Sequence, residues 1–146
     1  GEYVKTGNVA VDSILNYKLE VIEKQTGCKP QLRIDIPCES MISEADLNIV
    51  LGNLLDNAGE ALQKSKEKHL DIRLKYEKGI LYLSIYNSFD GVVYKGSNSK
   101  FKTRKQDDVK HGYGLQSVER IVNKYSGIMR ITHDEHLFCV DLYFYV

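Results

Sequence analysis

The chain has 146 residues, of which 42% are hydrophobic and 27% are charged, so it has the size and composition of one globular domain. Its 20 lysine and arginine residues balance 20 aspartate and glutamate residues, which excludes the basic excess of a dedicated nucleic-acid-binding protein. No apolar run has the length of a membrane helix, and no signal-peptide pattern opens the sequence. Its 3 cysteines lack the spacing of a disulfide framework or a zinc site. We therefore expect a reducing, cytoplasmic setting.

The first part of the chain is predicted to form a helix and a short strand. Apolar residues recur at helical spacing over 9–25, with Asp12 or Ser13 as the expected cap and Gly27 as the expected stop. Polar and apolar residues then alternate over 31–36, which is typical of a strand.

A long helix and a hairpin are predicted next. Ser43 is the expected N-cap of a helix that runs to about Lys64. Alternating segments at 70–76 and 81–85 predict two strands, and the Lys-Gly pair at 78–79 is the turn between them.

The remaining chain is predicted to contain a long loop, a third helix and a second hairpin. The segment 90–112 lacks periodicity, and a helix is expected to begin at Gly114 and to end at 126–127. Strands are expected at 128–133 and 137–145. This order of elements predicts an α+β fold, a two-layer α/β sandwich with three helices on a mixed, mostly antiparallel sheet.

The long helix carries a polar stripe at steps of four, three and four residues, which places its members on one face. Its members are Asn53, Asn57, Glu60 and Lys64. A solvated face is one interpretation of this stripe. Two asparagines one turn apart are unfavourable in a helix, however, and glycines at positions 52 and 59 each cost about 1 kcal/mol relative to alanine. These costs indicate that something approaches the helix closely.

A pair of glycines precedes the third predicted helix. Gly112 and Gly114 lie at its expected start, where free amides and the helix dipole form an anion site. The loop 90–112 upstream holds six lysine and arginine residues and three aspartates. Fixed amides beside mobile cations are expected of a nucleotide phosphate site with a lid, and a solvated basic segment is the alternative.

Asn87 is a third candidate. It continues the alternation of Leu81, Leu83 and Ile85 and therefore points to the core face at the end of a strand. A buried amide needs partners, which are either its own turn-rich segment at 87–91 or a ligand.

Together these motifs resemble the ATP-binding catalytic domain of sensor histidine kinases, in the superfamily shared with gyrase, heat-shock chaperones and MutL. The matching segments are LGNLLDNAGEA at 51–61 (N box), NSFDG at 87–91 (in place of the G1 box), FKTRK at 101–105 (F box of the lid) and HGYGLQSV at 111–118 (G2 box). The resemblance implies a Bergerat-type fold over 11–146 with a lid at about 90–112, and a lead-in at 1–10 from an upstream domain.

In detail, these motifs are similar to those of one branch of the family, the peptide-pheromone (quorum-sensing) receptor kinases. That branch tends to have Asn at the position of the G1 aspartate, as at Asn87, and HGxGL in the G2 box. The segment 6–18, TGNVAVDSILNYK, is also similar to the entry of that branch into the domain.

The resemblance implies ATP and Mg²⁺ as cofactors. Asn57 would coordinate Mg²⁺ through its amide oxygen, and Asn53 would assist with metal or phosphate. Asn87 would accept a hydrogen bond from the adenine amino group, and Gly91 would let the base approach closely. The implied phosphate and lid contacts are Thr103, Arg104, Lys105, His111, Gly112, Gly114 and Leu115.

The sequence departs from the family pattern in three places. The G1 segment lacks its aspartate and has Phe89 where the middle glycine is usual, which affects purine selectivity. ATP-hydrolysing relatives have a glutamate where Asn53 stands, and a neutral amide cannot act as a general base, which favours phosphoryl transfer over hydrolysis. Glu60 stands where many kinases have a basic residue, and no role is assigned to it.

The resemblance implies transfer of the γ-phosphoryl group to a histidine on an upstream dimerisation domain. The four histidines lie at positions 69, 111, 133 and 136, so we expect that this phosphoacceptor is absent from the chain. The implied setting is the cytoplasmic part of a bacterial membrane receptor, a homodimer that acts on a cognate response regulator and not on nucleic acid. The alternatives are a degenerate nucleotide-binding domain that serves as a protein-interaction module, and an ATP-hydrolysing clamp or anti-sigma-factor kinase.

Overall fold

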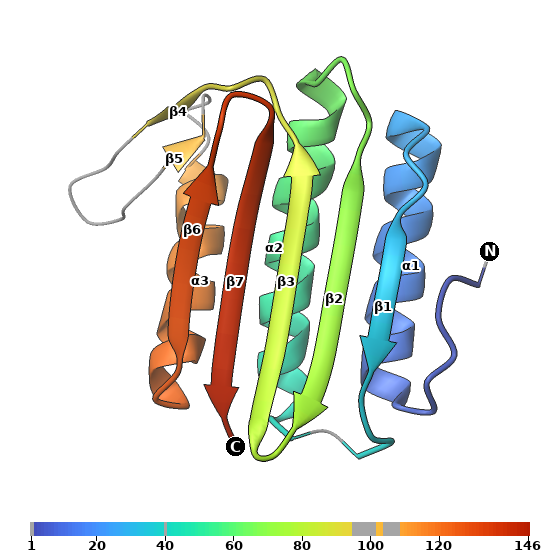
Figure 1. Cartoon of the computed structure of the whole chain (residues 1–146), viewed down its shortest axis with the longest axis vertical. Helices are drawn as coiled ribbons and strands as arrows, with labels where there is room; N and C mark the ends of the chain where they lie inside the picture. Colours follow the sequence, from blue (N-terminus) through green and yellow to red (C-terminus); the bar gives the residue numbers. More distant parts are fainter. Residues whose placement is uncertain (1, 40, 95–101, 104–108) are drawn as a thin grey trace.

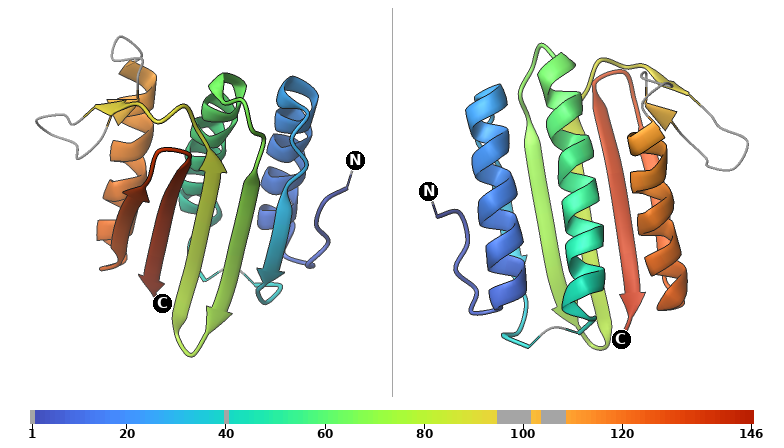
Figure 2. Two further views of the ribbon diagram at one scale, coloured as in Figure 1. Left: turned by 45° about the horizontal axis from the view of Figure 1, so that its top comes forward. Right: turned by 180° about the vertical axis from the view of Figure 1, so that it is seen from behind.

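Three helices pack side by side on one face of a five-stranded sheet (Figures 1 and 2). The computed structural model describes residues 2–39, 41–94, 102–103 and 109–146. Its elements are α1 (Val9–Thr26), β1 (Gln31–Asp35), α2 (Glu44–Lys64), β2 (Leu70–Glu77), β3 (Ile80–Ser88), β4 (Val93–Tyr94), β5 (Lys102–Thr103), α3 (Val109–Lys124), β6 (Ile128–His133) and β7 (Leu137–Tyr145). The predicted α+β sandwich is therefore confirmed. No helix in the described ranges is both long enough and apolar enough to cross a membrane.

The strand order of the sheet is β1-β2-β3-β7-β6. The β1–β2 pair is parallel because α2 carries the chain across the sheet between them, and the other pairs are antiparallel. The turn between β2 and β3 has positive φ at both central residues, 51° at Lys78 and 80° at Gly79, which suits the right-handed twist of a hairpin. The mixed sheet and the 78–79 turn agree with the prediction.

The start of α1 differs from the prediction. Asn8 is the N-cap, and its side chain accepts a hydrogen bond from the backbone N–H of Val11 at 3.1 Å. The expectation of Asp12 or Ser13 as the cap is wrong, because both lie inside the helix, which begins at Val9. Gly27 ends the helix as predicted, with a left-handed φ of 76°.

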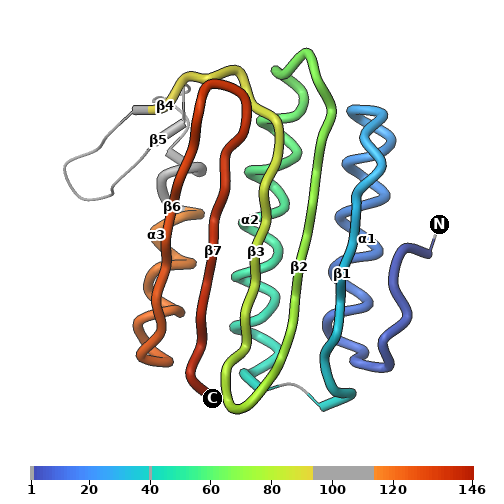
Figure 3. The backbone as a smooth tube through the Cα atoms, in the orientation of Figure 1, coloured from blue at the N-terminus to red at the C-terminus, as the bar shows by residue number. Residues whose placement is uncertain are grey.

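The segment before α1 lies along that helix (Figure 3). Asn16 of α1 accepts a hydrogen bond from the backbone N–H of Tyr3 at 2.7 Å. Asp12 accepts hydrogen bonds from the backbone N–H of Thr6, at 3.0 Å from its nearer oxygen, and from the Thr6 hydroxyl at 2.7 Å. The α1 side chains thus bind the residues that were predicted as a lead-in.

One face of α2 forms the centre of the core. Its buried apolar residues are Leu47, Val50, Leu51, Leu54, Leu55, Ala58 and Leu62. Ser43 caps the helix as predicted and accepts from the N–H of Asp46 at 3.1 Å. The sequence indicated that something approaches this helix closely, and at Gly59 the neighbour is α1. A side chain at position 59 would place its Cβ 3.1 Å from Ile22 of α1. Gly52 has more room, because its nearest neighbour, Lys18, is 4.0 Å from such a Cβ.

Helix α3 begins at Val109 and not at Gly114, so the predicted start is wrong. Valine, lysine and histidine at 109–111 all tolerate a helix, and each glycine costs about 1 kcal/mol without preventing one. Gly114 is therefore the sixth residue of the helix, beyond the four whose amides lack helical partners. The predicted glycine pair lies within the helix, and the Gly114 amide is not an exposed anion donor in this conformation.

Candidate functional site

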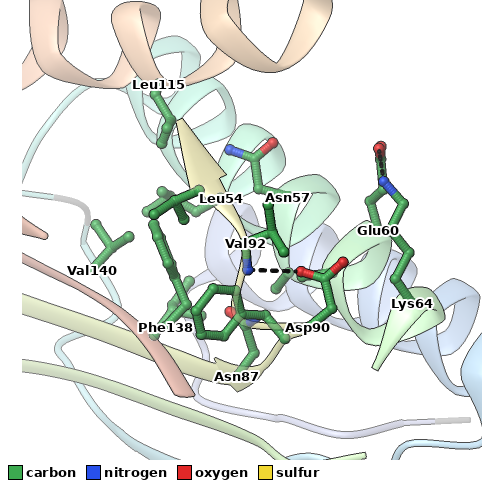
Figure 4. Close-up of a pocket in the computed structure, with 15 residues that line it drawn as sticks. Leu54, Asn57, Glu60, Lys64, Asn87, Asp90, Val92, Leu115, Phe138 and Val140 are labelled. Atoms are coloured by element: carbon green, nitrogen blue, oxygen red, sulfur yellow. Dashed lines mark hydrogen bonds and ion pairs between the residues drawn. The ribbon is translucent and has the colours of Figure 1, made fainter. Parts of the chain in front are cut away.

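A cleft lies where α2 ends, beside β3, β7 and α3, and encloses about 710 Å³ when the space open to solvent is included (Figure 4). Its apolar lining consists of Leu54, Ala58, Ala61, Ile85, Phe89, Val92, Val93, Leu115, Phe138 and Val140. Its polar lining consists of Asn57, Glu60, Lys64, Asn87 and Asp90. Such an apolar cleft with a few polar groups suits a ligand that has a flat apolar part and a polar end.

Three of the four residues in the predicted stripe of α2 line this cleft. Glu60 and Lys64 form an ion pair, with 3.5 Å between the ammonium nitrogen and the carboxylate. The side-chain nitrogen of Asn57 is buried and has no hydrogen-bond partner in the described part of the chain. Because an unpaired buried amide group is costly, this end of Asn57 is suited to a ligand.

The same amide bears on whether Mg²⁺ fits the cleft. The nitrogen and oxygen of an amide exchange places by rotation, which would turn the Asn57 oxygen to the unpaired position. The residues that the structure describes contain no group of three or more histidine, cysteine, aspartate or glutamate side chains suited to hold a metal. Asn57 therefore fits Mg²⁺ as a single oxygen ligand, with the other ligands supplied by phosphate oxygens and water.

Asn53 is the stripe residue that does not line the cleft. Its side-chain nitrogen donates to the carbonyl of Ile49 at 2.8 Å, and its oxygen faces α3. A Cβ on Gly114 would lie 3.4 Å from that oxygen. The structure thus brings Asn53 and Gly114 together, although 61 positions separate them in the sequence.

Asn87 is 5% exposed and lies at the floor of the cleft, on the core face as predicted (Figure 4). Its nitrogen donates to the carbonyl of Ser88 at 3.0 Å. That bond uses one of the two N–H groups and orients the amide, so its oxygen is the acceptor that can serve a ligand. The two interpretations of Asn87, a local turn contact and a ligand contact, are therefore compatible.

The turn after Asn87 has a packing role. Phe89 is buried, lines the cleft and packs edge-to-face on Phe138 with ring centroids 5.6 Å apart. Asp90 accepts from the N–H of Val92 at 3.0 Å. Gly91 has a φ of 87°, and a Cβ there would lie 2.9 Å from the carbonyl of Glu135. Glycine is therefore required at position 91 by the backbone conformation and by the nearby Glu135 carbonyl, whether or not a base binds beside it.

The other predicted site residues are placed in part. Thr103 pairs with Val93 across β4 and β5, which brings its backbone close to the cleft lining. Leu115 lines the cleft from α3. The backbones of His111 and Gly112 belong to α3. Arg104 and Lys105 lie outside the described residues.

Sequence reasoning missed the contribution of β7. Phe138 and Val140 line the cleft because β7 pairs with β3, which sets them opposite Asn87 and Ile85. The alternation over 137–145 predicted a strand but did not indicate which strand it would pair with. Lys64 was predicted on the stripe, whereas Asp90 carried no signal beyond its place in a turn-rich segment.

An anchor at the opposite ends of the same helices sets their spacing. The Asp46 carboxylate of α2 accepts from the Lys124 ammonium at 2.8 Å and from the Tyr125 hydroxyl at 2.7 Å. Tyr125 also accepts from the backbone N–H of Ser43 at 3.2 Å. The hydrogen bond from Lys124, followed by that from Tyr125, lowers the pKa of Asp46. The anchor joins the start of α2 to the end of α3.

A family model described as the GHKL domain matches residues 42–145. The fold is similar to the mycobacterial sensor histidine kinase MprB, at 16% identity and a TM-score of 0.68, over 92% of this chain and 94% of that chain. It is also similar to the catalytic domain of histidine kinase ThkA in a nucleotide-free form, at 18% identity and a TM-score of 0.71, over 99% and 95%. Acinetobacter baumannii histidine kinase AdeS is similar at 18% identity and a TM-score of 0.67, over 99% and 67%. A search of curated proteins found no significant match.

Replacing Asp46 with asparagine should lower the free energy of unfolding by about 1–3 kcal/mol near neutral pH, since it removes a charged hydrogen-bond acceptor. The lowered pKa means that this carboxylate stabilises the fold above its unfolded-state pKa of about 3.9 and loses that contribution as the pH falls through the folded value. Urea unfolding at several pH values would measure both effects. Glu77→Gln, which alters an exposed pair with Lys75, should change stability little. Equal effects of the two variants would contradict the assigned anchor.

Proposed function

The chain belongs to the GHKL domain family, and we propose that it is the ATP-binding catalytic domain of a sensor histidine kinase. The observation that supports this most is the pair of amides in one apolar cleft, the unpaired Asn57 and the buried Asn87. An apolar slot with a hydrogen-bond acceptor at its floor suits a purine, and a polar rim suits the sugar and phosphates.

In this proposal the base lies against the apolar wall of β3 and β7. Asn87 accepts a hydrogen bond from the amino group of adenine through its oxygen. Its bond to the Ser88 carbonyl at 3.0 Å holds the amide in that orientation. The 6-oxo group of guanine would face the same oxygen and find no donor there.

The phosphates lie toward Asn57 and the start of α3. Asn57 would hold Mg²⁺ through its amide oxygen, and the charge of the bound ion would help to neutralise the transferring group. Asn53, beside Gly114, is placed to assist at that end. Contacts from the amides of Gly112 and Gly114 require that α3 begin later in the chain when nucleotide is bound, because Gly114 now lies within the helix. Thr103, Arg104, Lys105 and His111 are the proposed lid contacts.

The proposed reaction is transfer of the γ-phosphoryl group to a histidine on an upstream dimerisation domain, followed by passage to a cognate response regulator. The proposed parent protein is a bacterial membrane receptor that acts as a homodimer, with this domain, 11–146, in the cytoplasm. A place in the quorum-sensing branch rests on Asn87 and on the HGYGL motif at 111–115.

The second candidate is a degenerate domain that binds a partner protein. It is favoured by Phe89 in the G1 segment and by the helical amide of Gly114. The discriminating experiment joins this chain to the upstream segment of its parent protein and adds ATP labelled at the γ-phosphate. Label on a histidine of that segment supports the kinase. Tight nucleotide binding with no label on that segment supports the interaction module.

Asn57→Ala should weaken the binding of Mg-ATP by about tenfold or more, because it removes the amide that serves the metal. Asn48→Ala is the matched control, since Asn48 is an exposed asparagine on the same helix. Titration calorimetry with and without Mg²⁺ would measure the affinities, and circular dichroism would check the fold. Unchanged affinity in Asn57→Ala would remove the support for a metal ligand on α2.

ATP should bind about tenfold or more tightly than GTP, because the bond to Ser88 orients the Asn87 amide so that its oxygen, an acceptor, meets the 6-position of the base. Asn87→Asp retains the acceptor and should retain the preference, whereas Asn87→Ala should reduce it. Competition between each nucleotide and a fluorescent ATP analogue would measure the ratio. Equal affinity of the unaltered chain for ATP and GTP would contradict the assigned orientation.

A further inference from the structure

Glu60 is a carboxylate at the mouth of the cleft that has no part in the metal, base or lid contacts proposed above (Figure 4). Its side chain is 23% exposed and lies within an ion pair to Lys64, whose side chain is 29% exposed. A carboxylate this close to a polyphosphate site would repel the ligand if it faced the phosphates. Its presence in the lining therefore needs a different explanation.

The position of Glu60 on α2 locates the part of a nucleotide that it would meet. Residues three apart on a helix are neighbours, at roughly 5–6 Å between their Cβ atoms, so Glu60 lies one turn beyond Asn57. Asn57 is the proposed metal and phosphate ligand, and Asn87 is the proposed base contact. A nucleotide joins its base to its phosphates through the sugar, so a residue on the rim beside Asn57 and away from the phosphates meets the sugar.

The chemistry of a carboxylate matches the sugar better than any other part of the nucleotide. An ionised carboxylate accepts hydrogen bonds and donates none, and its two oxygens accept from two donors at once. Ribose presents two adjacent hydroxyl groups, which are the neutral donors of a nucleotide outside its base.

The geometry points to Glu60 as the residue that recognises the ribose hydroxyls and thereby selects ribonucleotides over deoxyribonucleotides. This inference rests on the proposed function, since it assumes that a nucleotide occupies the cleft. Lys64 acts as a positioning residue. Its ammonium, 3.5 Å from the carboxylate, holds Glu60 at the mouth of the cleft.

The test compares the binding of Mg-ATP with that of its 2′-deoxy and 3′-deoxy forms by titration calorimetry on this chain. The unaltered chain should bind each deoxy form about tenfold more weakly than ATP, the loss expected for one charge-assisted hydrogen bond. Glu60→Ala should bring the three affinities to within about twofold of one another, and Glu60→Gln should leave an intermediate preference. Alanine is the best helix former, so α2 should be retained.

Glu77→Gln is the control for a change in net charge, because Glu77 lies at the exposed end of β2 in an ion pair with Lys75. It should keep the full preference for ribose. Lys64→Met should reduce the ratio of the affinity for ATP to the affinity for its deoxy forms. Loss of helix stability alone would weaken the binding of all three nucleotides and leave that ratio unchanged.

The outcomes separate this inference from the proposed function. Equal binding of ATP and its deoxy forms by the unaltered chain would overturn the role of Glu60 and leave the nucleotide site intact. A gain in affinity for all three nucleotides in Glu60→Ala at an unchanged ratio would also overturn it, because the carboxylate would then act by repulsion alone. No binding of any nucleotide would overturn the proposed function, and this inference with it.

Discussion

The packing of α2 against the central strands is the constraint on which the other features of this protein depend. Leu51, Leu55 and Leu62 are fully buried, so the orientation of the helix about its own axis is set by the core. Close contact with α1 at Gly59 covers a second side of the helix. The polar stripe is left facing the space between α2 and α3. Three of its four residues, Asn57, Glu60 and Lys64, therefore line the cleft, because the core determines where they point.

Two contacts hold α3 beside this helix. At one end Asp46 binds Lys124 and Tyr125, and near the other end Asn53 lies against Gly114. Between them the two helices run side by side (Figure 2). The cleft opens beyond the second contact, where α2 continues past the start of α3. The spacing of its walls is thus set by contacts within the protein, among them the approach of the Asn53 side chain to Gly114.

Elements with strong periodicity were predictable, and elements that depend on their neighbours were not. The core face of α2 and the core position of Asn87 follow from local spacing alone. The start of α3 does not, because residues 109–111 are compatible with either a loop or a helix. Phe138 and Val140 reach the cleft through the pairing of β7 with β3, and no local pattern specifies a partner strand. The predicted cap of α1 was wrong because Asp12 and Ser13, near the start of the helix, are residue types that favour caps, whereas Asn8 occupies the cap position in the structure.

The distribution of amides and carboxylates in the cleft bears on the chemistry that the proposed function requires. Hydrolysis needs a base within hydrogen-bond reach of a water at the γ-phosphate. On the proposed placement that region is lined by Asn53 and Asn57, which are neutral, while Glu60 is engaged by Lys64 on the side of the sugar. Neutral amides bind a metal-phosphate complex without adding negative charge and without activating water. On the proposed function, a cleft of this composition would hold ATP without hydrolysing it until an acceptor histidine is bound. The imidazole of that histidine is itself the nucleophile, so the transfer needs no carboxylate to activate water.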